Sequence, residues 1–198
     1  MIEYTKSSPN WSPRPQGLND VWGVLLHHTA TGGDTGQAVA NFFSKRASKV
    51  SAHDVIDEHG VVWHCVSIEK AAWHAGQCRR YDWDRDGIHE DWEQYVNSHT
   101  IGIEFCNTGS TSDNYPRPQI KSAAQLIRRW DAKCPNLKLR NVTDHQAVNL
   151  NGKVDVKSNF PAALLFWYIL HPTMAPPDNN IYHALPGWAR LQVDEIKK

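Results

Sequence analysis

Two histidine-containing segments of the sequence have the residue types and spacing of a metal site. An apolar run ends in His27 and His28, and the segment "TDHQAVNLNGKVDV" places His145 and Asp155 ten residues apart across an Asn-Gly turn. Side chains alternate along a strand, so His27 and His28 must point to opposite faces, and at most one of them faces a shared site. Two imidazoles and one carboxylate form a donor set that zinc accepts, with a fourth position left for water in catalytic sites.

A second segment, "DWDRDGIHEDWE" over residues 82–93, satisfies the calcium-loop pattern D-x-D-x-D-G-x5-E. In such loops acidic side chains and one backbone carbonyl converge on a single ion. The ligands predicted here are Asp82, Asp84, Asp86, the carbonyl of Ile88, and Glu93. No clear amphipathic helix precedes this loop, and His89 occupies a position that is usually apolar. The alternative is therefore a solvated acidic insertion, neutralised by Arg79, Arg80 and Arg85.

The elements that must position these residues follow from hydrophobic periodicity. Apolar runs predict strands over 21–27 and 99–105, and two β-rich runs around the turn "DEHG" predict a hairpin over 51–66. Helical spacing predicts helices over 35–47, capped by Asp34, and over 118–134. The apolar segment 159–170 is short and predicts a buried helix. Strands and helices are mixed, which indicates one α/β domain with a largely buried sheet.

This pattern divides the chain of 198 residues into three parts. We expect an irregular N-terminal arm over 1–20, a catalytic domain over 21–172, and a C-terminal extension over 173–198 that packs on the domain. No apolar run approaches the roughly 18 residues of a membrane helix, and the N-terminus lacks the features of a signal peptide. We therefore expect a protein that is cytoplasmic as synthesised, monomeric, and not inserted in a membrane.

Composition also limits the classes of partner and cofactor. Lys and Arg together number 21, as do Asp and Glu, so the formal net charge is zero and bulk electrostatics give no support to nucleic-acid binding. The four cysteines are scattered and contain no CxxC pair, which argues against a cysteine zinc site. Histidine and aspartate therefore remain the better candidates for metal ligands.

Five sequence blocks, in order, resemble one family. They are "LLHHTA", "SAHDVIDEHGVVWHCV", "AAWHAG", "IGIEF" and "DHQAVNLNGKVD". Together they are similar to the zinc-dependent N-acetylmuramoyl-L-alanine amidases, which share a fold with peptidoglycan recognition proteins and phage lysozyme-type amidases. The resemblance implies a mixed central β-sheet flanked by helices, one zinc ion, and cleavage of the amide between the lactyl group of muramic acid and L-alanine.

The resemblance also implies a zinc ligand set. The matching positions are the first histidine of "HHTA", the histidine of "DHQ" and the last aspartate of "GKVD", which are His27, His145 and Asp155. His28 then faces away and is expected to be structural. Two departures affect the shape of the loops more than the ligand set: Asp144 replaces the usual glycine, and Val156-Lys157 replaces the usual Pro-Gly.

Other matching positions imply roles in catalysis and binding. Glu104 of "GIEF" matches the acid that acts on the zinc-bound water in one branch; a second branch uses a tyrosine where this chain has Ala52. Lys153 matches an active-site lysine. Their structural alternatives are a hydrogen bond to the His27 strand for Glu104 and a salt bridge to Asp155 for Lys153. Trp73 and His74 are expected to line the cleft, the alternative being a packed aromatic corner.

The predicted function is zinc-dependent hydrolysis of the muramoyl–L-alanine amide, with peptidoglycan or muropeptides as partners. We favour a cell-wall lysin, released without a signal peptide as phage lysins are. One alternative is a cytoplasmic enzyme that recycles soluble muropeptides. Another is a module that binds peptidoglycan without cutting it, which would typically lack the full ligand set.

Overall fold

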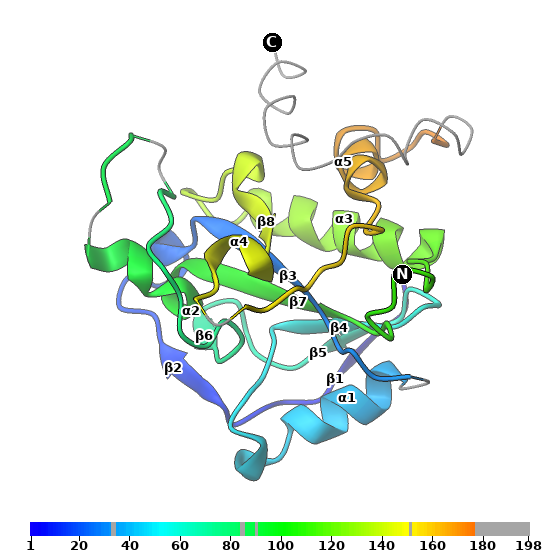
Figure 1. Ribbon diagram of the computed structural model, residues 1–198, viewed down its shortest axis with the longest axis horizontal. Helices are drawn as coiled ribbons and strands as arrows, with labels where there is room; N and C mark the ends of the chain where they lie inside the picture. The colour runs from blue at the N-terminus through cyan, green and yellow to red at the C-terminus, as the bar shows by residue number, and fades with distance from the viewer. Residues whose placement is uncertain (33–34, 84–85, 90, 151, 177–198) are drawn as a thin grey trace.

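A six-stranded sheet forms the centre of the computed structural model, which describes residues 1–32, 35–83, 86–89, 91–150 and 152–176 (Figure 1). The strand order is β1-β5-β4-β7-β3-β8. The strands of this sheet are β1 (Glu3–Thr5), β3 (Gly23–His28), β4 (Asp54–Ile56), β5 (Val62–His64), β7 (Thr100–Phe105) and β8 (Val142–Asp144). Two further strands, β2 (Trp11–Pro13) and β6 (Lys70–Ala72), form a separate antiparallel pair.

The directions of the strands make the sheet mixed. β4 and β5 are antiparallel, as a hairpin requires, whereas the other neighbouring pairs are parallel. The helices are α1 (Gly36–Phe43), α2 (Val96–His99), α3 (Arg117–Asp131), α4 (His145–Val148) and α5 (Ala162–Leu170). Short 3-10 turns lie at η1 (Gly17–Asp20), η2 (Arg46–Ser48), η3 (Asp91–Gln94) and η4 (Leu139–Asn141). The predicted α/β domain with a mixed, helix-flanked sheet is confirmed.

Alternation along the strands builds a different core on each face of the sheet. Ile56 of β4 packs in the large cluster formed with α3 and α5, whereas its neighbour Val55 packs in a smaller cluster with α1. In β3, Leu26 belongs to the α3 side and Leu25 to the opposite side. α1 and α3 therefore cover opposite faces of the sheet (Figure 1), and His27, two residues after Leu25, lies on the α1 face.

The predicted elements correspond closely to those in the structure. The strands expected over 21–27 and 99–105 are β3 and β7, the hairpin is β4–β5, and the helices over 118–134 and 159–170 are α3 and α5. The helix expected over 35–47 is the shorter α1, and its N-cap is Thr35, whose hydroxyl accepts a hydrogen bond from the Ala38 N–H. The predicted cap, Asp34, lies outside the described residues.

The N-terminal arm is not irregular as predicted. β1 extends the central sheet by pairing in parallel with β5, and β2 pairs with β6. The buried guanidinium of Arg14 anchors the arm, because it donates hydrogen bonds to the backbone carbonyls of Ile68, Lys70 and Thr100. Three-residue strands are too short to show periodicity in a sequence, and these are held mainly by pairing to distant segments.

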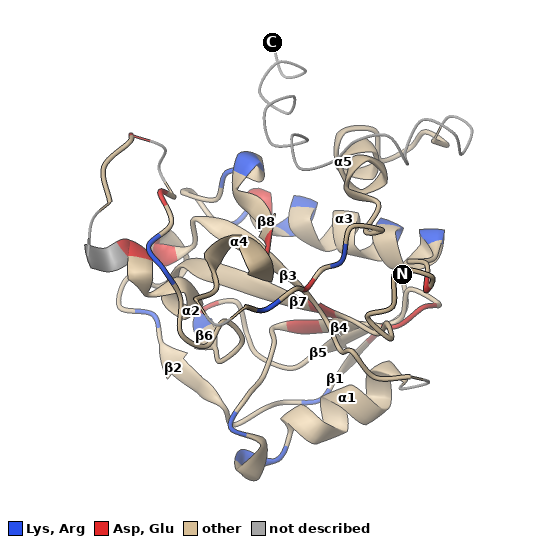
Figure 2. Ribbon diagram, in the orientation of Figure 1, with Lys and Arg blue, Asp and Glu red and all other residues tan. Residues whose placement is uncertain are grey.

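The two remaining expectations concern the C-terminus and the surface. Of the extension predicted over 173–198, residues 177–198 lie outside the described residues. Among the helices that the structure describes, none combines the length and apolar character needed to span a membrane. Figure 2 shows basic and acidic residues spread over many elements, in keeping with the zero net charge.

Candidate active site

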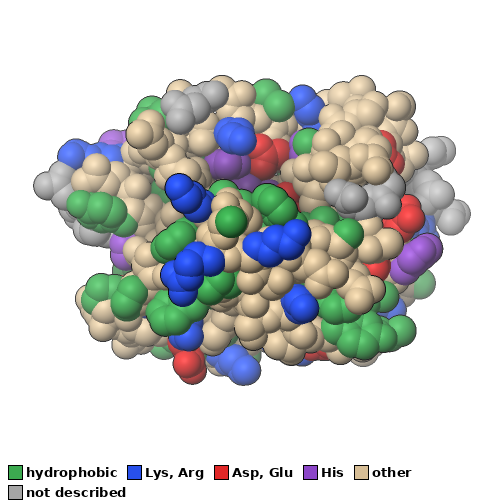
Figure 3. Space-filling model, turned by 90° about the horizontal axis from the view of Figure 1, so that it is seen from below, with side chains coloured by type: hydrophobic (Ala, Val, Ile, Leu, Met, Phe, Trp, Pro, Cys, Tyr) green, Lys and Arg blue, Asp and Glu red, His purple; other side chains and the backbone are tan. Residues whose placement is uncertain are grey.

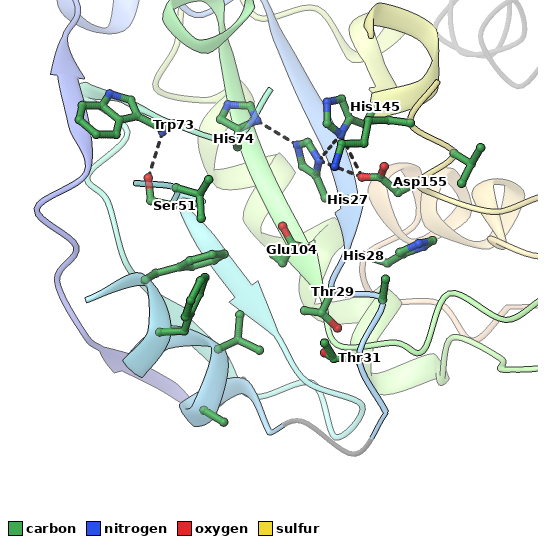
Figure 4. Close-up of a pocket in the computed structure, with 18 of the residues that line it drawn as sticks. His27, His28, Thr29, Thr31, Ser51, Trp73, His74, Glu104, His145 and Asp155 are labelled. Carbon is green, nitrogen blue, oxygen red and sulfur yellow. Dashed lines mark hydrogen bonds and ion pairs between the residues drawn. The ribbon is translucent and has the colours of Figure 1, made fainter. Parts of the chain in front are cut away.

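Three side chains that are far apart in the sequence meet above the sheet. His27 lies in β3, His145 is the first residue of α4, and Asp155 lies in the loop after α4. The Nδ1 atoms of His27 and His145 are 3.1 Å apart, and each is 3.1 Å from Oδ2 of Asp155. Figure 4 shows the three side chains pointing toward one another. Among the described residues, this is the one group of three or more His, Cys, Asp or Glu side chains with metal-binding geometry.

Local structure explains how His145 reaches this position. Parallel pairing aligns the end of β8 with β3, with Asp144 opposite Leu26. Asp144 then caps α4, because its carboxylate accepts a hydrogen bond from the Ala147 N–H at 2.8 Å. An aspartate in place of the usual glycine therefore suits this chain, since it fixes the start of the short helix that carries His145.

The spacing of the three atoms fits a zinc ion. A tetrahedral site with bonds of about 2.0–2.1 Å places its ligand atoms about 3.3–3.4 Å apart, close to the 3.1 Å edges of this triangle. The side chains are also largely buried, with His27 3% and Asp155 13% exposed. A cluster of inward-facing donor atoms of this kind is what a tightly bound cation requires.

The protonation states favour metal binding as well. The other ring nitrogen of His145, Nε2, lies 2.9 Å from the Ala75 carbonyl, which only accepts; a neutral His145 therefore carries its proton there and presents a lone pair at Nδ1. Burial lowers the pKa of His27. Although burial alone would raise the pKa of Asp155, the neighbouring side chains of His145 and His27 hold it well below its usual range. Neutral imidazoles and an ionised carboxylate are the forms that bind zinc.

Glu104 lies beside the triad in the neighbouring strand, opposite His27 in the β3–β7 register. Its side chain lines the cleft, and no hydrogen bond or ion pair joins it to any other described residue. Burial raises the pKa of Glu104 to about 8, the charge of Asp155 adds to this rise, and Lys153 opposes it. This half-buried carboxylate is positioned to exchange a proton with a group in the cleft.

Lys153 precedes Asp155 by two residues and also lines the cleft. Its side chain is exposed, and no ion pair with Asp155 occurs in the described part of the chain. The predicted alternative, a salt bridge that neutralises Asp155, is therefore not seen. The ammonium group is available to an anionic or polarised group in the cleft.

The three side chains open onto a cleft of about 680 Å³. Seen from below in Figure 3, histidine and acidic side chains meet in a hollow, with basic side chains nearby. The opposite wall is apolar and comes from α1, with Val39, Phe42 and Phe43. Sequence periodicity identified these α1 residues only as a helical stripe; the half-exposed state of Phe42 is a tertiary feature that no sequence signal provided.

Trp73 and His74 both line this cleft, as expected, but they differ in their contacts. The Trp73 indole N–H donates to the hydroxyl of Ser12 at 2.8 Å, which orients its ring from the N-terminal arm. His74 lies closer to the metal ligands, with its Nδ1 2.9 Å from Nε2 of His27. Its main contacts are thus with a predicted zinc ligand, which sequence analysis did not anticipate.

His28 faces away from the triad, as predicted. Its Nδ1 lies 3.1 Å from the Tyr115 hydroxyl on the α3 side of the sheet. His53 is fully buried, and its Nδ1 accepts a hydrogen bond from the Gly102 N–H of β7. Both histidines therefore have structural contacts, and neither joins the candidate metal group.

The acidic loop gives little support to the calcium prediction. The carboxylate of Glu93 is fully buried and accepts a hydrogen bond from the Trp83 N–H at 2.9 Å. Asp86 accepts from the Ile88 N–H, and Oδ2 of Asp82 accepts from the Gly87 N–H. Oδ1 of Asp82 is buried without a hydrogen-bond partner in the described part of the chain. The described acids form no metal-binding group, and Asp84 lies outside the described residues.

Comparison with solved structures shows the same fold in several enzymes and lysins. A selenomethionine derivative of AmpD matches with a TM-score of 0.67 and 22% identity over 83% of this chain and 92% of that chain. AmpDH3 of Pseudomonas aeruginosa, in complex with an anhydromuramic pentapeptide, matches with a TM-score of 0.58 and 25% identity over 78% and 62%. A mutant endolysin from Bacillus subtilis matches with a TM-score of 0.54 and 23% identity over 85% and 95%.

No curated protein matches the chain closely enough to add a sequence relative. The match to a sequence family is extensive, however. Residues 17–158, more than half of the chain, match the family described as N-acetylmuramoyl-L-alanine amidase. This range contains the three converging side chains, Glu104 and Lys153, and so the chain belongs to the N-acetylmuramoyl-L-alanine amidase family of enzymes.

Proposed function

We propose that this protein is a zinc-dependent hydrolase of the amide between the lactyl group of N-acetylmuramic acid and L-alanine. The observation that carries the proposal is the triangle of His27, His145 and Asp155, whose donor atoms lie 3.1 Å apart at the base of a cleft. Muropeptides occupy related proteins: AmpDH3 was solved with an anhydromuramic pentapeptide, and AmiD from E. coli with anhydro-N-acetylmuramic acid-L-Ala-D-gamma-Glu-L-Lys.

His27, His145 and Asp155 would hold the zinc ion. Zinc in such a site supplies Lewis-acid chemistry, since it polarises the scissile carbonyl and lowers the pKa of water. The two buried imidazoles keep the ligand set neutral apart from one carboxylate, which leaves a net positive centre for an electron-rich carbonyl. The cleft would give water and substrate access to these three side chains.

Glu104 is proposed as the general base and acid. Its carboxylate accepts a proton from the attacking water and then delivers that proton to the departing amine of L-alanine. Its position opposite His27 places it at the metal-facing end of β7. A carboxyl group whose pKa is raised by burial to about 8 holds a proton near neutral pH more readily than an ordinary glutamate.

Lys153 is proposed to stabilise the negative charge that develops on the carbonyl oxygen during attack. It lines the same cleft as Glu104, and its charge lowers the pKa of that carboxyl group. The apolar wall of α1 and the ring of Trp73 would contact the sugar and peptide parts of the substrate. Apolar and aromatic surface with a few polar groups is typical of such a binding site.

The test is mass spectrometry of muropeptides after digestion with the zinc-loaded protein. Cleavage at the proposed bond gives products with a free lactyl carboxylate and a free L-alanine amine. Products cut at a peptide or glycosidic bond instead would refute the assignment. Metal analysis distinguishes the enzyme from a binding module. A binding module would bind cell walls without containing zinc and would release no L-alanine amine.

The same proposal includes a role as a cell-wall lysin, for which the endolysin of Bacillus subtilis is the structural precedent. Turnover on intact peptidoglycan and on a soluble anhydromuropeptide should be measured side by side. Faster loss of turbidity from intact walls supports a lysin. Efficient cleavage of the soluble fragment with no loss of turbidity would contradict that role and support muropeptide recycling.

A further inference from the structure

The second ring nitrogen of His27 raises a question about its protonation. Nδ1 faces the metal triad, and Nε2 lies 2.9 Å from Nδ1 of His74. A neutral imidazole carries one proton, so Nδ1 can bind zinc only when Nε2 holds that proton. For His145 the nearest partner of Nε2 is the carbonyl of Ala75 at 2.9 Å, which only accepts, while the side-chain amide nitrogen of Asn149 lies farther away at 3.2 Å. For His27 the neighbour is another imidazole, which can donate or accept.

The contacts beyond His74 resolve this ambiguity. Nε2 of His74 lies 3.3 Å from Oγ1 of Thr100, and that hydroxyl donates its single proton to the Val96 carbonyl at 2.6 Å. The hydroxyl oxygen therefore has only lone pairs to offer His74. His74 must then donate from Nε2, which leaves a lone pair on its Nδ1.

The direction of the remaining bond follows from this. Nδ1 of His74 can only accept, so Nε2 of His27 must be the donor. The Nδ1 of His27 then presents its lone pair to the triad. The carbonyl of Val96 in α2, which can only accept, thus sets the direction of three successive hydrogen bonds. These run through Thr100 and His74 to His27, and they leave the lone pair on the nitrogen of His27 that faces the triad.

The ring of His74 is held in place by its surroundings. A Cβ atom at Gly102 of β7 would lie 2.6 Å from Cγ and Nδ1 of this ring, so only glycine leaves the space that the imidazole fills. The amide groups of His74 and Ala75 both donate to Oδ1 of Asn97, at 3.0 and 2.8 Å. Figure 4 shows His74 directed toward His27.

We propose that Thr100 and His74 form a hydrogen-bond chain that fixes His27 in the tautomer competent to bind zinc. The inference rests on the proposed function, since it assigns two positioning residues to the zinc site. Outer partners of this kind typically change metal affinity by about 10- to 100-fold when they are removed. The chain also fixes the orientation of the His27 ring, because donor and acceptor must remain aligned.

Thr100→Val is the decisive variant, because valine keeps the shape of threonine and removes the hydroxyl. We expect the zinc dissociation constant, measured by chelator competition, to rise about 3- to 10-fold. Thr143→Val is the matched control: Thr143 is a buried threonine of β8 whose hydroxyl has no hydrogen-bond partner among the described residues. Its zinc affinity should equal that of the wild type.

His74→Leu and His74→Asn separate hydrogen bonding from packing. His74→Leu should weaken zinc about 10- to 100-fold. His74→Asn places an amide oxygen where Nδ1 accepts, and so should recover most of the affinity. Melting of each metal-free variant shows whether it folds; if His74→Leu does not, Thr100→Val decides the question. Equal losses in folded His74→Asn and His74→Leu would contradict the acceptor role of His74.

Two spectroscopic measurements test the tautomer directly. Long-range proton–nitrogen NMR of the zinc-loaded wild type should show His74 protonated at Nε2, and Thr100→Val should show mixed tautomers of His74. The visible absorption of the cobalt-substituted protein should change in Thr100→Val and stay constant in Thr143→Val. His74 protonated at Nδ1, or wild-type zinc affinity in Thr100→Val, would overturn the inference. A wild type without zinc affinity would overturn the proposed function together with it.

Discussion

His27, His145 and Asp155 come from β3, α4 and the loop after α4 and meet, whereas Asp82, Asp86 and Glu93 lie close together in the sequence and form no metal-binding group in the described part of the chain. Both sets match a metal-ligand spacing in the sequence. In the triad the donor atoms stand 3.1 Å apart. In the loop the acids accept hydrogen bonds from backbone N–H groups instead.

The difference shows that, for bringing metal ligands together, rigid support by strands and helices matters more than their spacing in the sequence. His27 is held by pairing on both sides of β3, and His145 by a capped helix. Glu93, by contrast, accepts a hydrogen bond from the backbone N–H of Trp83, which is fully buried in a cluster with Leu25 and Val148. Because this cluster includes Leu25 of β3 and Val148 of α4, Trp83 of the acidic loop packs with the two elements that carry His27 and His145.

The largest effect should come from the triad itself. Asp155→Ala removes one of three ligands and leaves two facing imidazoles, so we expect loss of tightly held zinc and a fall in turnover of about 10³-fold or more. Asp86→Ala, the matched change in the loop, should keep one zinc per chain and near-wild-type turnover. Metal analysis and muropeptide assays measure both. Equal zinc loss in the two variants would break the contrast between the regions.

Glu104→Gln should abolish most turnover and spare the metal. The amide cannot take the proton from water, so the rate should fall about 10²- to 10⁴-fold, while zinc stays at one per chain. The melting temperature should not fall, because a half-buried carboxylate with no described hydrogen-bond partner is replaced by a neutral group of the same shape. A variant that retains more than about a tenth of the wild-type rate would exclude Glu104 as the base.

Substitutions at Glu93 in the acidic loop should change the stability of the folded protein and leave its zinc content unchanged. Glu93→Ala leaves the buried Trp83 N–H without its acceptor, which costs about 1–3 kcal/mol and should lower the melting temperature by about 2–12 °C. Glu93→Gln keeps an acceptor oxygen and should be milder. Zinc content should stay constant in both, and the exposed Glu69→Ala serves as the control for thermal melting. Loss of zinc at unchanged stability would contradict the structural role of Glu93.

Calcium should have the smallest effect. A cation that binds only the folded protein would raise its melting temperature, but Glu93 already uses its carboxylate within the protein. We expect millimolar calcium, added to zinc-loaded protein, to leave the melting temperature unchanged and to give no heat of binding. A rise that disappears in Asp82→Ala would reverse this conclusion and restore the calcium site predicted from the loop sequence.

The sequence by itself determined the major elements and the identity of the residues that meet. Periodicity predicted β3, β7, the β4–β5 hairpin, α3 and α5, because each buries a continuous apolar stripe that is visible in the sequence. The ordered blocks indicated the family and pointed to His27, His145 and Asp155. Alternation along a strand also predicted that His28 would face away from them.

Only the tertiary structure decided what surrounds these residues. β1 and β2 are three-residue strands, held by pairing with segments more than 50 residues away. The contact of His74 with His27 depends on the space above Gly102 and on a threonine 26 positions later in the chain. The acidic loop shows the reverse case, since its pattern is complete while Asp82, Asp86 and Glu93 accept hydrogen bonds from backbone N–H groups. Local spacing shows which atoms can bind a metal, but packing and hydrogen bonding between distant segments decide which atoms remain available for it.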